Sequence, residues 1–346
     1  MKLSEMFFKK SKVFIIAELS ANHGHDIEIA KKTILAAKEA GTDAIKVQTY
    51  TADTLTIDSE EECFKLNWGT IWDGITLYDL YKEAALPWEW QKELKEYAEG
   101  LGLVFFSTPF DITAVDFLED LDVPIYKVAS FEIMDIPLIE YIASKGKPVI
   151  LSTGVAELAD IEAAITAMKR VGNEKIVLLK TTSSYPAKTE DANLETMRNM
   201  KDTFGVEVGV SDHTQGAIVP IVSVALGGSV IEKHFILDRS VGGPDASFSL
   251  LPEEFNQMVN SVREAEKALG QVDYSIDEKK KNNRKLSRSL FFVQEMKKGD
   301  VITEENVKSI RPGDGLPPKY LPDLIGKKVR KDIKRGTPAN WMYIEL

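Results

Sequence analysis

The stretch VEVGVSDH, residues 206–213, is a short apolar run that ends on charged and polar side chains. Seven other runs share this form, and amphipathic helical stretches, most of them closed by glycine, separate them. They are VFIIAE (13–18), DAIKVQ (43–48), LVFFST (103–108), IYKVAS (125–130), VILST (149–153), IVLLKTT (176–182) and SVIEKHF (229–235). Alternation of apolar strands and helices is typical of parallel βαβ units. Eight such units predict a closed (β/α)8 TIM barrel.

The polar side chains at the strand ends are candidates for an active site, because barrels of this class carry their chemistry at the carboxyl ends of the strands. In chain order they are Glu18, Lys46, Gln48, Thr108, Lys127, Ser130, Ser152, Lys180, Thr182, Asp212, His213, Lys233 and His234. One pattern therefore predicts both the fold and the place of the site.

Composition narrows the class of protein. The formal net charge is −11, and no basic stripe interrupts it, so we expect no binding to nucleic acid or to an anionic membrane. Cys63 is the single cysteine, which excludes an intramolecular disulfide. The first apolar run, VFIIA, is too short for a signal sequence or a membrane span. These features predict a cytoplasmic protein.

The chain of 346 residues is long enough for a barrel and an additional module. We expect the barrel over 1–270, a polar linker over 271–285 and a small module of short β-like runs over 286–346. An aromatic-rich insertion over 51–86 follows the second strand, and its place at a strand's carboxyl end puts it above the barrel mouth. The alternatives for the insertion are a surface subdomain and a substrate lid.

Two of the four histidines, His213 and His234, end the seventh and eighth strands, which are neighbours in a barrel. Two imidazoles at such a place predict a shared divalent ion with open positions for water and substrate. A pair of hydrogen-bonded histidines without an ion is the alternative. Mn²⁺ is the ion we expect beside a phosphate-bearing substrate, with Mg²⁺ or Co²⁺ as alternatives.

Lys46 and Lys127 lie in otherwise apolar runs, where lysine is rarely buried without a partner. Hydroxyl side chains gather at the same face of the barrel, at Thr108, Ser130, Ser152, Ser183 and Ser211. Such a cluster offers cations and donors to a phosphate or a carboxylate, whereas structural Lys–Glu pairs are the alternative. Glu18 is a candidate general acid or base, or a partner that neutralises one lysine.

Ordered segments of the chain resemble the sialic acid synthase family, which condenses phosphoenolpyruvate with an amino sugar. These segments are IIAELSANHG (15–24), IKVQT (45–49), FFSTPFD (105–111), YKVASFE (126–132), PVILSTG (148–154), SSYPA (183–187), GVSDHT (209–214) and IEKHF (231–235). RSLFF (288–292) and IRPGDG (310–315) resemble the antifreeze-protein-like (SAF) domain that follows the barrel in that family. Within the family, GTIWDGITLYDLY (69–81) and GPDASFSL (243–250) are similar to the pseudaminic acid synthase branch.

The resemblance implies a role for each matching residue. His213 and His234 would bind the metal, and Glu18, Lys127 and His234 would act in catalysis. Phosphoenolpyruvate would be held by Lys46, Gln48, Thr108, Lys127, Ser130, Ser152, Ser183 and Ser211, of which Ser183 stands where the neuraminate and legionaminate branches have Asn. The sugar would meet Glu132, Tyr185, Asp245 and Arg311. Because Arg311 would enter the site from the small domain of the partner subunit, the resemblance also implies a domain-swapped homodimer.

The implied reaction joins phosphoenolpyruvate, 2,4-diacetamido-2,4,6-trideoxy-β-L-altrose and water into pseudaminic acid and phosphate, with cleavage of a C–O bond. An N-acetylneuraminate or legionaminate synthase is the first alternative. A Schiff-base aldolase that uses Lys127 or Lys180 and a sugar-acid-binding module without catalysis are the others.

Overall fold

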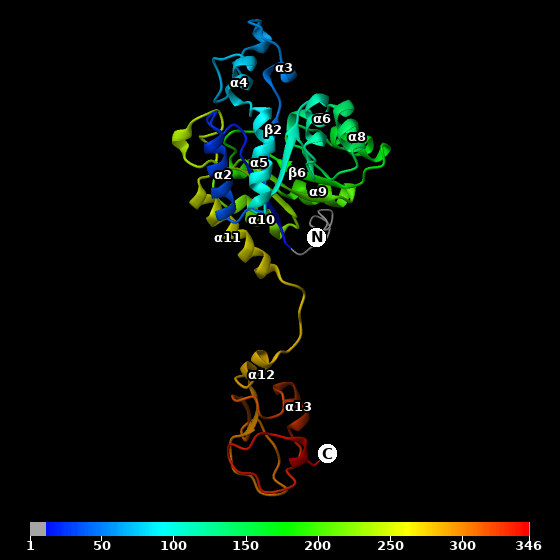
Figure 1. Ribbon diagram of the computed structural model, residues 1–346. Helices are drawn as coiled ribbons and strands as arrows, with labels where there is room; N and C mark the ends of the chain where they lie inside the picture. Colours follow the sequence, from blue (N-terminus) through cyan, green and yellow to red (C-terminus); the bar gives the residue numbers. More distant parts are fainter. Residues whose placement is uncertain (1–11, 346) are drawn as a thin grey trace. The chain divides into compact units, whose positions relative to one another are not determined.

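The structure is a computed structural model that describes residues 12–345 (Figure 1). The chain divides into two compact units, of which the first ends at Gly270 and the second begins at Gln271.

Eight parallel strands form a closed barrel in chain order, and β8 pairs with β1 to complete it. The predicted TIM barrel is therefore confirmed. The strands are β1 (Phe14–Glu18), β2 (Ala44–Thr49), β3 (Val104–Pro109), β4 (Tyr126–Val128), β5 (Val149–Ser152), β6 (Ile176–Thr181), β7 (Glu207–Asp212) and β8 (Val230–His234).

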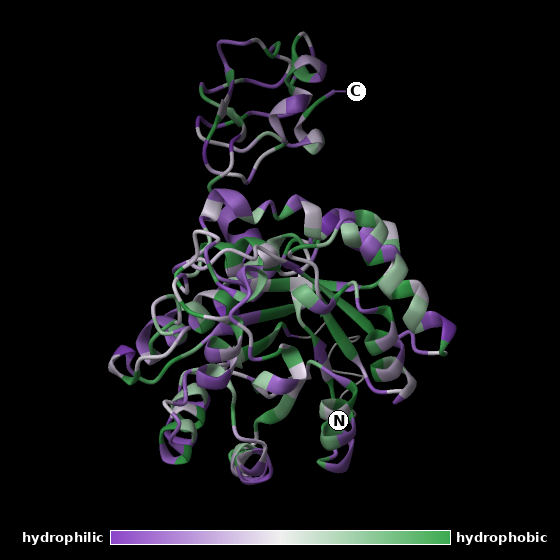
Figure 2. Cartoon of the chain, turned by 90° about the horizontal axis from the view of Figure 1, so that it is seen from above, coloured by the Kyte–Doolittle hydropathy of each residue, from purple (hydrophilic) through white to green (hydrophobic). Residues whose placement is uncertain are grey.

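A helix follows each strand and packs outside the barrel. These helices are α2 (Ile27–Glu39), α5 (Trp88–Gly100), α6 (Ile112–Asp120), α7 (Ile136–Ser144), α8 (Leu158–Arg170), α9 (Glu195–Phe204), α10 (Ile218–Ala225) and α11 (Pro252–Leu269). Figure 2 shows hydrophobic strands surrounded by helices that carry hydrophilic residues. In α2 the Asp26 carboxylate accepts a hydrogen bond from Glu28 N (2.8 Å), and Gly41 follows the helix with a φ of 92°. Both are ordinary start and stop signals of a helix.

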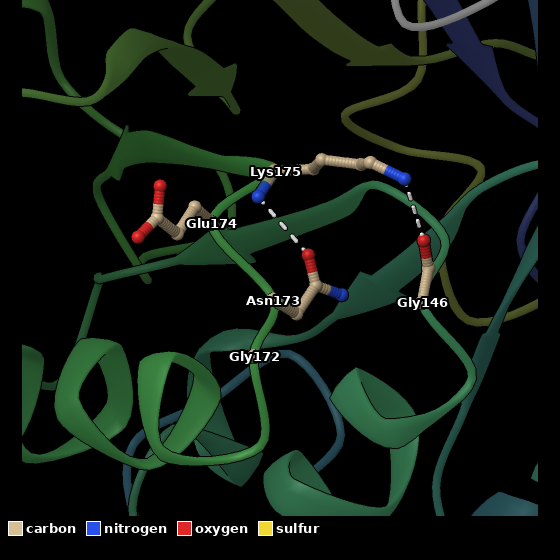
Figure 3. Close-up of a pocket in the computed structure, with 5 residues that line it drawn as sticks. All are labelled: Gly146, Gly172, Asn173, Glu174 and Lys175. Carbon is tan, nitrogen blue, oxygen red and sulfur yellow. Dashed lines mark hydrogen bonds between the residues drawn. The ribbon is translucent and has the colours of Figure 1, made fainter.

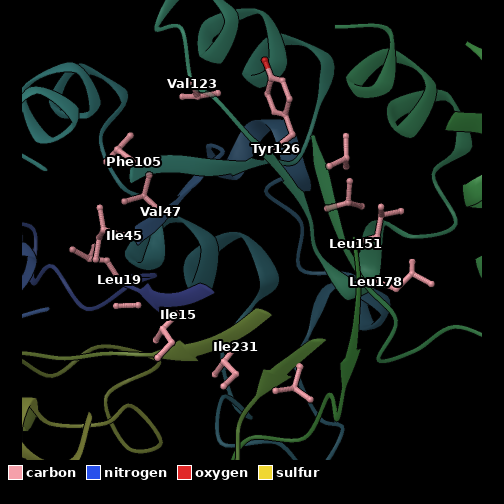
Figure 4. Packing of buried hydrophobic residues seen from close by; sticks show 14 of the residues in the cluster. Ile15, Leu19, Ile45, Val47, Phe105, Val123, Tyr126, Leu151, Leu178 and Ile231 are labelled. Carbon is pink, nitrogen blue, oxygen red and sulfur yellow. The ribbon is translucent and has the colours of Figure 1, made fainter. Parts of the chain in front are cut away.

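Successive side chains of each strand face opposite sides of the barrel wall. One set fills the barrel interior and includes Phe14, Ile16 and Val230. The other set, which includes Ile15 and Ile231, packs in the larger cluster between strands and helices (Figure 4). The interior set continues at the carboxyl ends of the strands with polar residues, namely Glu18, Lys46, Thr108, Lys127, Ser152, Thr181, Ser211, Glu232 and His234.

The amino ends of β5 and β6 lie beside a surface hollow lined by Gly146, Gly172, Asn173, Glu174 and Lys175 (Figure 3). Lys175 Nζ donates to Gly146 O (2.8 Å), and Lys175 N donates to Asn173 Oδ1 (3.0 Å). These contacts fasten two loops together at the face of a TIM barrel that serves stability rather than catalysis.

The insertion contains α3 (Ala52–Leu55) and α4 (Leu77–Ala84), which lie beyond one end of the barrel (Figure 1). Two histidines of the loop after β1 hold the end of α4. His23 Nε2 lies 3.3 Å from Ala84 O, and His25 Nε2 lies 2.7 Å from Glu83 O. The insertion is therefore fastened to the loops of the barrel mouth.

The second unit contains α12 (Glu278–Arg284), β9 (Ser289–Phe292), β10 (Val307–Ile310) and α13 (Leu321–Leu324). β9 and β10 pair antiparallel, and Leu290, Phe292 and Ile302 belong to a separate hydrophobic core. The range 271–285, expected as a linker, includes the helix α12. Among residues 12–345 no helix is both long and apolar enough to span a membrane.

Candidate active site

Lys46 lies at the centre of the polar layer inside the barrel. Its Nζ is 2.8 Å from Glu18 Oε2 and 3.4 Å from Glu232 Oε2, and it donates to Thr108 Oγ1 at 3.2 Å. Ser211 Oγ donates to Glu232 Oε1 at 3.0 Å. The strand register explains this grouping, because Glu18 pairs with Lys46 across β1 and β2, and Ser211 pairs with Glu232 across β7 and β8.

Lys127 is the second buried ammonium group of this layer. Its Nζ donates to Ser152 Oγ and to Val128 O, both at 2.7 Å. Burial lowers the pKa of Lys127 to about 8, although the carboxylates of Glu232 and Glu18 oppose this shift. Lys127 therefore remains mostly protonated at neutral pH.

The two carboxyl groups beside Lys46 differ in their proton affinity. Burial raises the pKa of Glu18 to about 7, and the attraction of Lys46 only partly offsets this rise. Burial acts against the Glu232 carboxylate as well, but Lys46 and Lys127 outweigh it and hold the pKa at about 2. When Glu18 and the neighbouring Glu132 are both protonated, two ammonium groups face the single charge of Glu232. The surplus positive charge favours an anionic ligand.

Hydroxyl groups meet beside Gly154, just after β5. Gly154 N donates to Ser130 Oγ at 3.2 Å. A Cβ on Gly154 would lie 2.0 Å from Ser183 Oγ and 2.9 Å from Ser130 Oγ, so a side chain there would displace both hydroxyls. Ser183 Oγ is buried and has no hydrogen-bond partner within residues 12–345. It is therefore available to a ligand that enters this part of the barrel.

The rings of His213 and His234 lie side by side, with 5.3 Å between their centroids. His213 Nδ1 donates to Thr182 O at 2.9 Å, which leaves Nε2 as the lone-pair nitrogen. His234 Nδ1 is buried without a hydrogen-bond partner in the described chain, 3.7 Å from Asp245 Oδ2. Burial lowers the pKa values of His213 and His234 to about 4 and about 3, so both rings are neutral near pH 7.

A divalent ion fits this histidine pair, because neutral imidazoles with free ring nitrogens are the form that metals bind. Within residues 12–345, no three His, Cys, Asp or Glu side chains are arranged to hold an ion. Two protein ligands leave coordination positions for water and substrate, as a catalytic rather than a structural site requires.

Aromatic rings line the mouth next to the histidines. The ring centroid of Tyr185 is 4.4 Å from that of His213 and 5.1 Å from that of Phe248. Phe248 in turn lies 5.0 Å from His234. Trp72, from the insertion, lies 5.4 Å from Tyr185, so the insertion reaches the site through this indole.

Residues 33–274 match the model of the NeuB family, and residues 287–342 match the SAF domain. The chain belongs to the NeuB family. It is 48% identical to a pseudaminic acid synthase of Campylobacter jejuni over 330 residues, which cover 95% of this chain and 96% of that protein. It is 39% identical to an N,N'-diacetyllegionaminic acid synthase of Legionella pneumophila, over 96% of this chain and 94% of that protein.

Among solved structures, the N-acetylneuraminic acid synthetase of Leptospira borgpetersenii superposes with a TM-score of 0.69 and 33% identity. The match covers 79% of this chain and 90% of that one. The resemblance to the sialic acid synthase family that the sequence suggested is thereby confirmed, together with the SAF domain.

The NeuB-family barrel brings most of the predicted site residues into one mouth. Gln48 pairs with Thr108 in the strand register, and Asp245 accepts hydrogen bonds from Ser20 Oγ and Ala21 N. Glu132 lies in the short 3-10 helix after β4, and burial raises its pKa to about 7. Arg311 is exposed and belongs to the second unit, in the loop after β10.

Three of the candidates that lie within the strands face the helices instead of the barrel interior. Lys180, Asp212 and Lys233 stand one position away from the interior set, and Lys233 Nζ lies 2.5 Å from Asp212 Oδ2. Conversely, Glu232 was not among the predicted site residues. Strand alternation predicts its position, because Glu232 stands two positions before His234 on β8 and therefore faces the same side of the barrel wall.

Proposed function

We propose that this NeuB-family protein condenses phosphoenolpyruvate with 2,4-diacetamido-2,4,6-trideoxy-β-L-altrose and water, giving pseudaminic acid and phosphate. One observation carries the proposal: Lys46 and Lys127 lie in the same barrel mouth as the neutral pair His213 and His234. The similarity to the Campylobacter jejuni pseudaminic acid synthase along nearly the whole chain supports the choice of product.

The lysine side of the mouth would bind phosphoenolpyruvate. Lys46 and Lys127 supply the surplus positive charge for its carboxylate and phosphate. The donors around them would be Gln48, Thr108, Ser130, Ser152, Ser183 and Ser211, and the unpartnered Ser183 hydroxyl supports this assignment. Because these groups are held before the substrate arrives, they would fix its C3 atom next to the sugar at a low entropic cost.

The histidine side would hold the sugar carbonyl. His213 and His234 would bind the divalent ion, proposed to be Mn²⁺, which supplies a Lewis acid for the carbonyl oxygen when bound. Tyr185 and Asp245 lie beside this pair, and together with Glu132 they would contact the sugar chain. Arg311 would come from the second unit of a partner copy, as part of a domain-swapped homodimer.

The bond changes follow from this placement. C3 of phosphoenolpyruvate attacks the aldehyde carbon of the open-chain sugar, and the carbonyl oxygen becomes a hydroxyl. Water adds to C2 and gives up one proton, which balances the proton taken up by the sugar oxygen. The tetrahedral adduct collapses to the C2 ketone as the C2–O bond to the phosphate breaks, and the remaining hydroxyl proton leaves with the phosphate. Glu18 would move the proton of the attacking water, because its raised pKa of about 7 suits proton transfer near neutral pH.

The test compares three open-chain substrates, namely the trideoxy altrose derivative and the matching precursors of neuraminate and legionaminate. Phosphate release and product mass are measured for each with Mn²⁺ present. We expect the trideoxy altrose derivative to give the highest kcat/KM and a product of the mass of pseudaminic acid. A higher kcat/KM with either other sugar would overturn the proposed product. Covalent labelling on borohydride treatment, independent of metal, would instead indicate a Schiff-base aldolase.

A further inference from the structure

We infer that Trp72 determines the selectivity of the site for a 6-deoxy sugar. With the rings of Tyr185 and Phe248 it forms an aromatic wall beside the two histidines, and this wall receives the methyl end of the sugar chain. The inference rests on the proposed function and adds that Trp72 is the residue of the insertion that contacts the methyl end of the substrate.

Hydrogen bonds within the loop stabilise the backbone around Trp72. The Asp73 carboxylate accepts from Trp68 N (3.1 Å), Gly69 N (2.8 Å) and Thr70 N (3.1 Å). Trp72 N donates to Thr70 Oγ1 at 3.2 Å. The backbone at Trp72 is therefore positioned before any ligand arrives, as a selective site requires.

A long-range contact fixes the direction of the indole. Trp72 Nε1 donates to Pro244 O at 3.1 Å, and Pro244 precedes Asp245, a proposed sugar contact. With its N–H occupied, the indole presents only its apolar ring surface. That ring lies 5.4 Å from Tyr185, which lies 4.4 Å from His213. The wall thus extends from the histidine pair outward to the insertion.

The division of the mouth into a charged and an aromatic side orients the sugar. Its aldehyde carbon must lie near the histidines, where C3 of phosphoenolpyruvate reaches it from the side of Lys46 and Lys127. The far end of the six-carbon chain then points away from Lys46 and Lys127 and toward Trp72. A methyl group there gains from burial against the rings, whereas a hydroxyl finds no partner on the indole and loses its hydration.

The experiment compares Trp72→Ala and Trp72→Phe with Trp68→Ala as the matched control. Trp68 lies in the same loop but is 63% exposed. Each protein is assayed with the 6-deoxy sugar and its 6-hydroxy counterpart. Apolar pockets distinguish such a pair by at most about 100-fold, so we expect Trp72→Ala to reduce the ratio of kcat/KM values about tenfold. Trp72→Phe should keep part of the ratio, and Trp68→Ala should leave it unchanged.

Equal losses for both sugars in Trp72→Ala, or the same change in Trp68→Ala, would overturn the inference. Calorimetry measures the Kd values of the two sugars in their reduced, unreactive alditol forms. The ratio of these Kd values reports the selectivity of binding without turnover. An unchanged ratio of Kd values in Trp72→Ala would also overturn it. Failure of the proposed function is distinguishable, because the wild-type protein then either releases no phosphate or shows a higher kcat/KM with one of the other two sugars.

Discussion

Glu132 is a partly buried carboxyl group whose Oε2 has no hydrogen-bond partner within the described chain. Burial raises its pKa from 4.5 to about 7, against the attraction of Lys127. The folded protein therefore binds this proton more tightly than the unfolded chain does. The resulting stabilisation is complete below pH 4.5 and is lost as the pH rises through 7.

We predict that Glu132→Gln, which removes the buried charge, raises the free energy of unfolding at pH 8 by about 1–2 kcal/mol, allowing for partial solvent screening. The gain should shrink by pH 5, where the wild-type carboxyl group is already protonated. Urea denaturation at both pH values measures it, with the exposed Glu190→Gln as control. A gain of equal size at pH 5 and pH 8 would contradict the assignment of the raised pKa.

Some properties of single residues were predictable from the sequence, and others were not. Glu18, Lys46 and His234 were predicted as site residues because each is polar and stands at the end of an apolar run, and in the structure all three face the barrel interior. Glu232 was missed and Lys233 was included because the strand-end rule ignored alternation. The contrast between the pKa values of Glu18 and Glu232 was beyond sequence reasoning, because it depends on the distances of both carboxylates from the lysines.

At the scale of elements, an ion pair joins the ends of β7 and β8 behind the histidines. Asp212 and Lys233 are register partners, their side chains are each 2% exposed, and Lys233 Nζ also donates to Thr214 O. His213 and His234 directly follow these two residues in the chain. The pair therefore holds both histidine-bearing strand ends in register.

We predict that Lys233→Met destabilises the fold by about 3–5 kcal/mol, because it leaves the Asp212 carboxylate buried without its partner. Lys201→Met removes the partly exposed pair with Glu207 and should cost about 1 kcal/mol or less. Urea denaturation of the two variants measures both losses of unfolding free energy. The double variant Asp212→Asn with Lys233→Met should recover part of the loss, and equal costs for both single variants would contradict the prediction.

The elements themselves followed closely from the sequence, because strand and helix periodicities are local. The eight predicted strands all form, although β4 is shortened to Tyr126–Val128, where the chain turns into the 3-10 helix Ser130–Glu132. The role of the insertion depended on contacts between distant segments, such as Trp72 with Pro244, and local patterns do not encode these. The helix α12 was missed, although Asp277 caps it.

At the scale of the whole molecule, the barrel unit holds the buried charges and the histidine pair, while Arg311 belongs to a second unit with its own hydrophobic core. In the proposed domain-swapped homodimer, each site combines the barrel of one copy with Arg311 of the other. The two parts of a site are then separable by mixing subunits.

We predict that Arg311→Ala and His213→Ala, each with little activity alone, complement each other. A mixed dimer would contain one site with an intact barrel and an intact partner arginine, so it should show about half the wild-type activity per dimer. Co-expression with two different affinity tags isolates such dimers. Mixed dimers of His213→Ala and Lys46→Met are the control and should stay inactive, because both of their barrels are defective. Absence of recovery in the Arg311→Ala mixture would show that Arg311 serves its own barrel or none, since the swapped arrangement necessarily rebuilds one complete site.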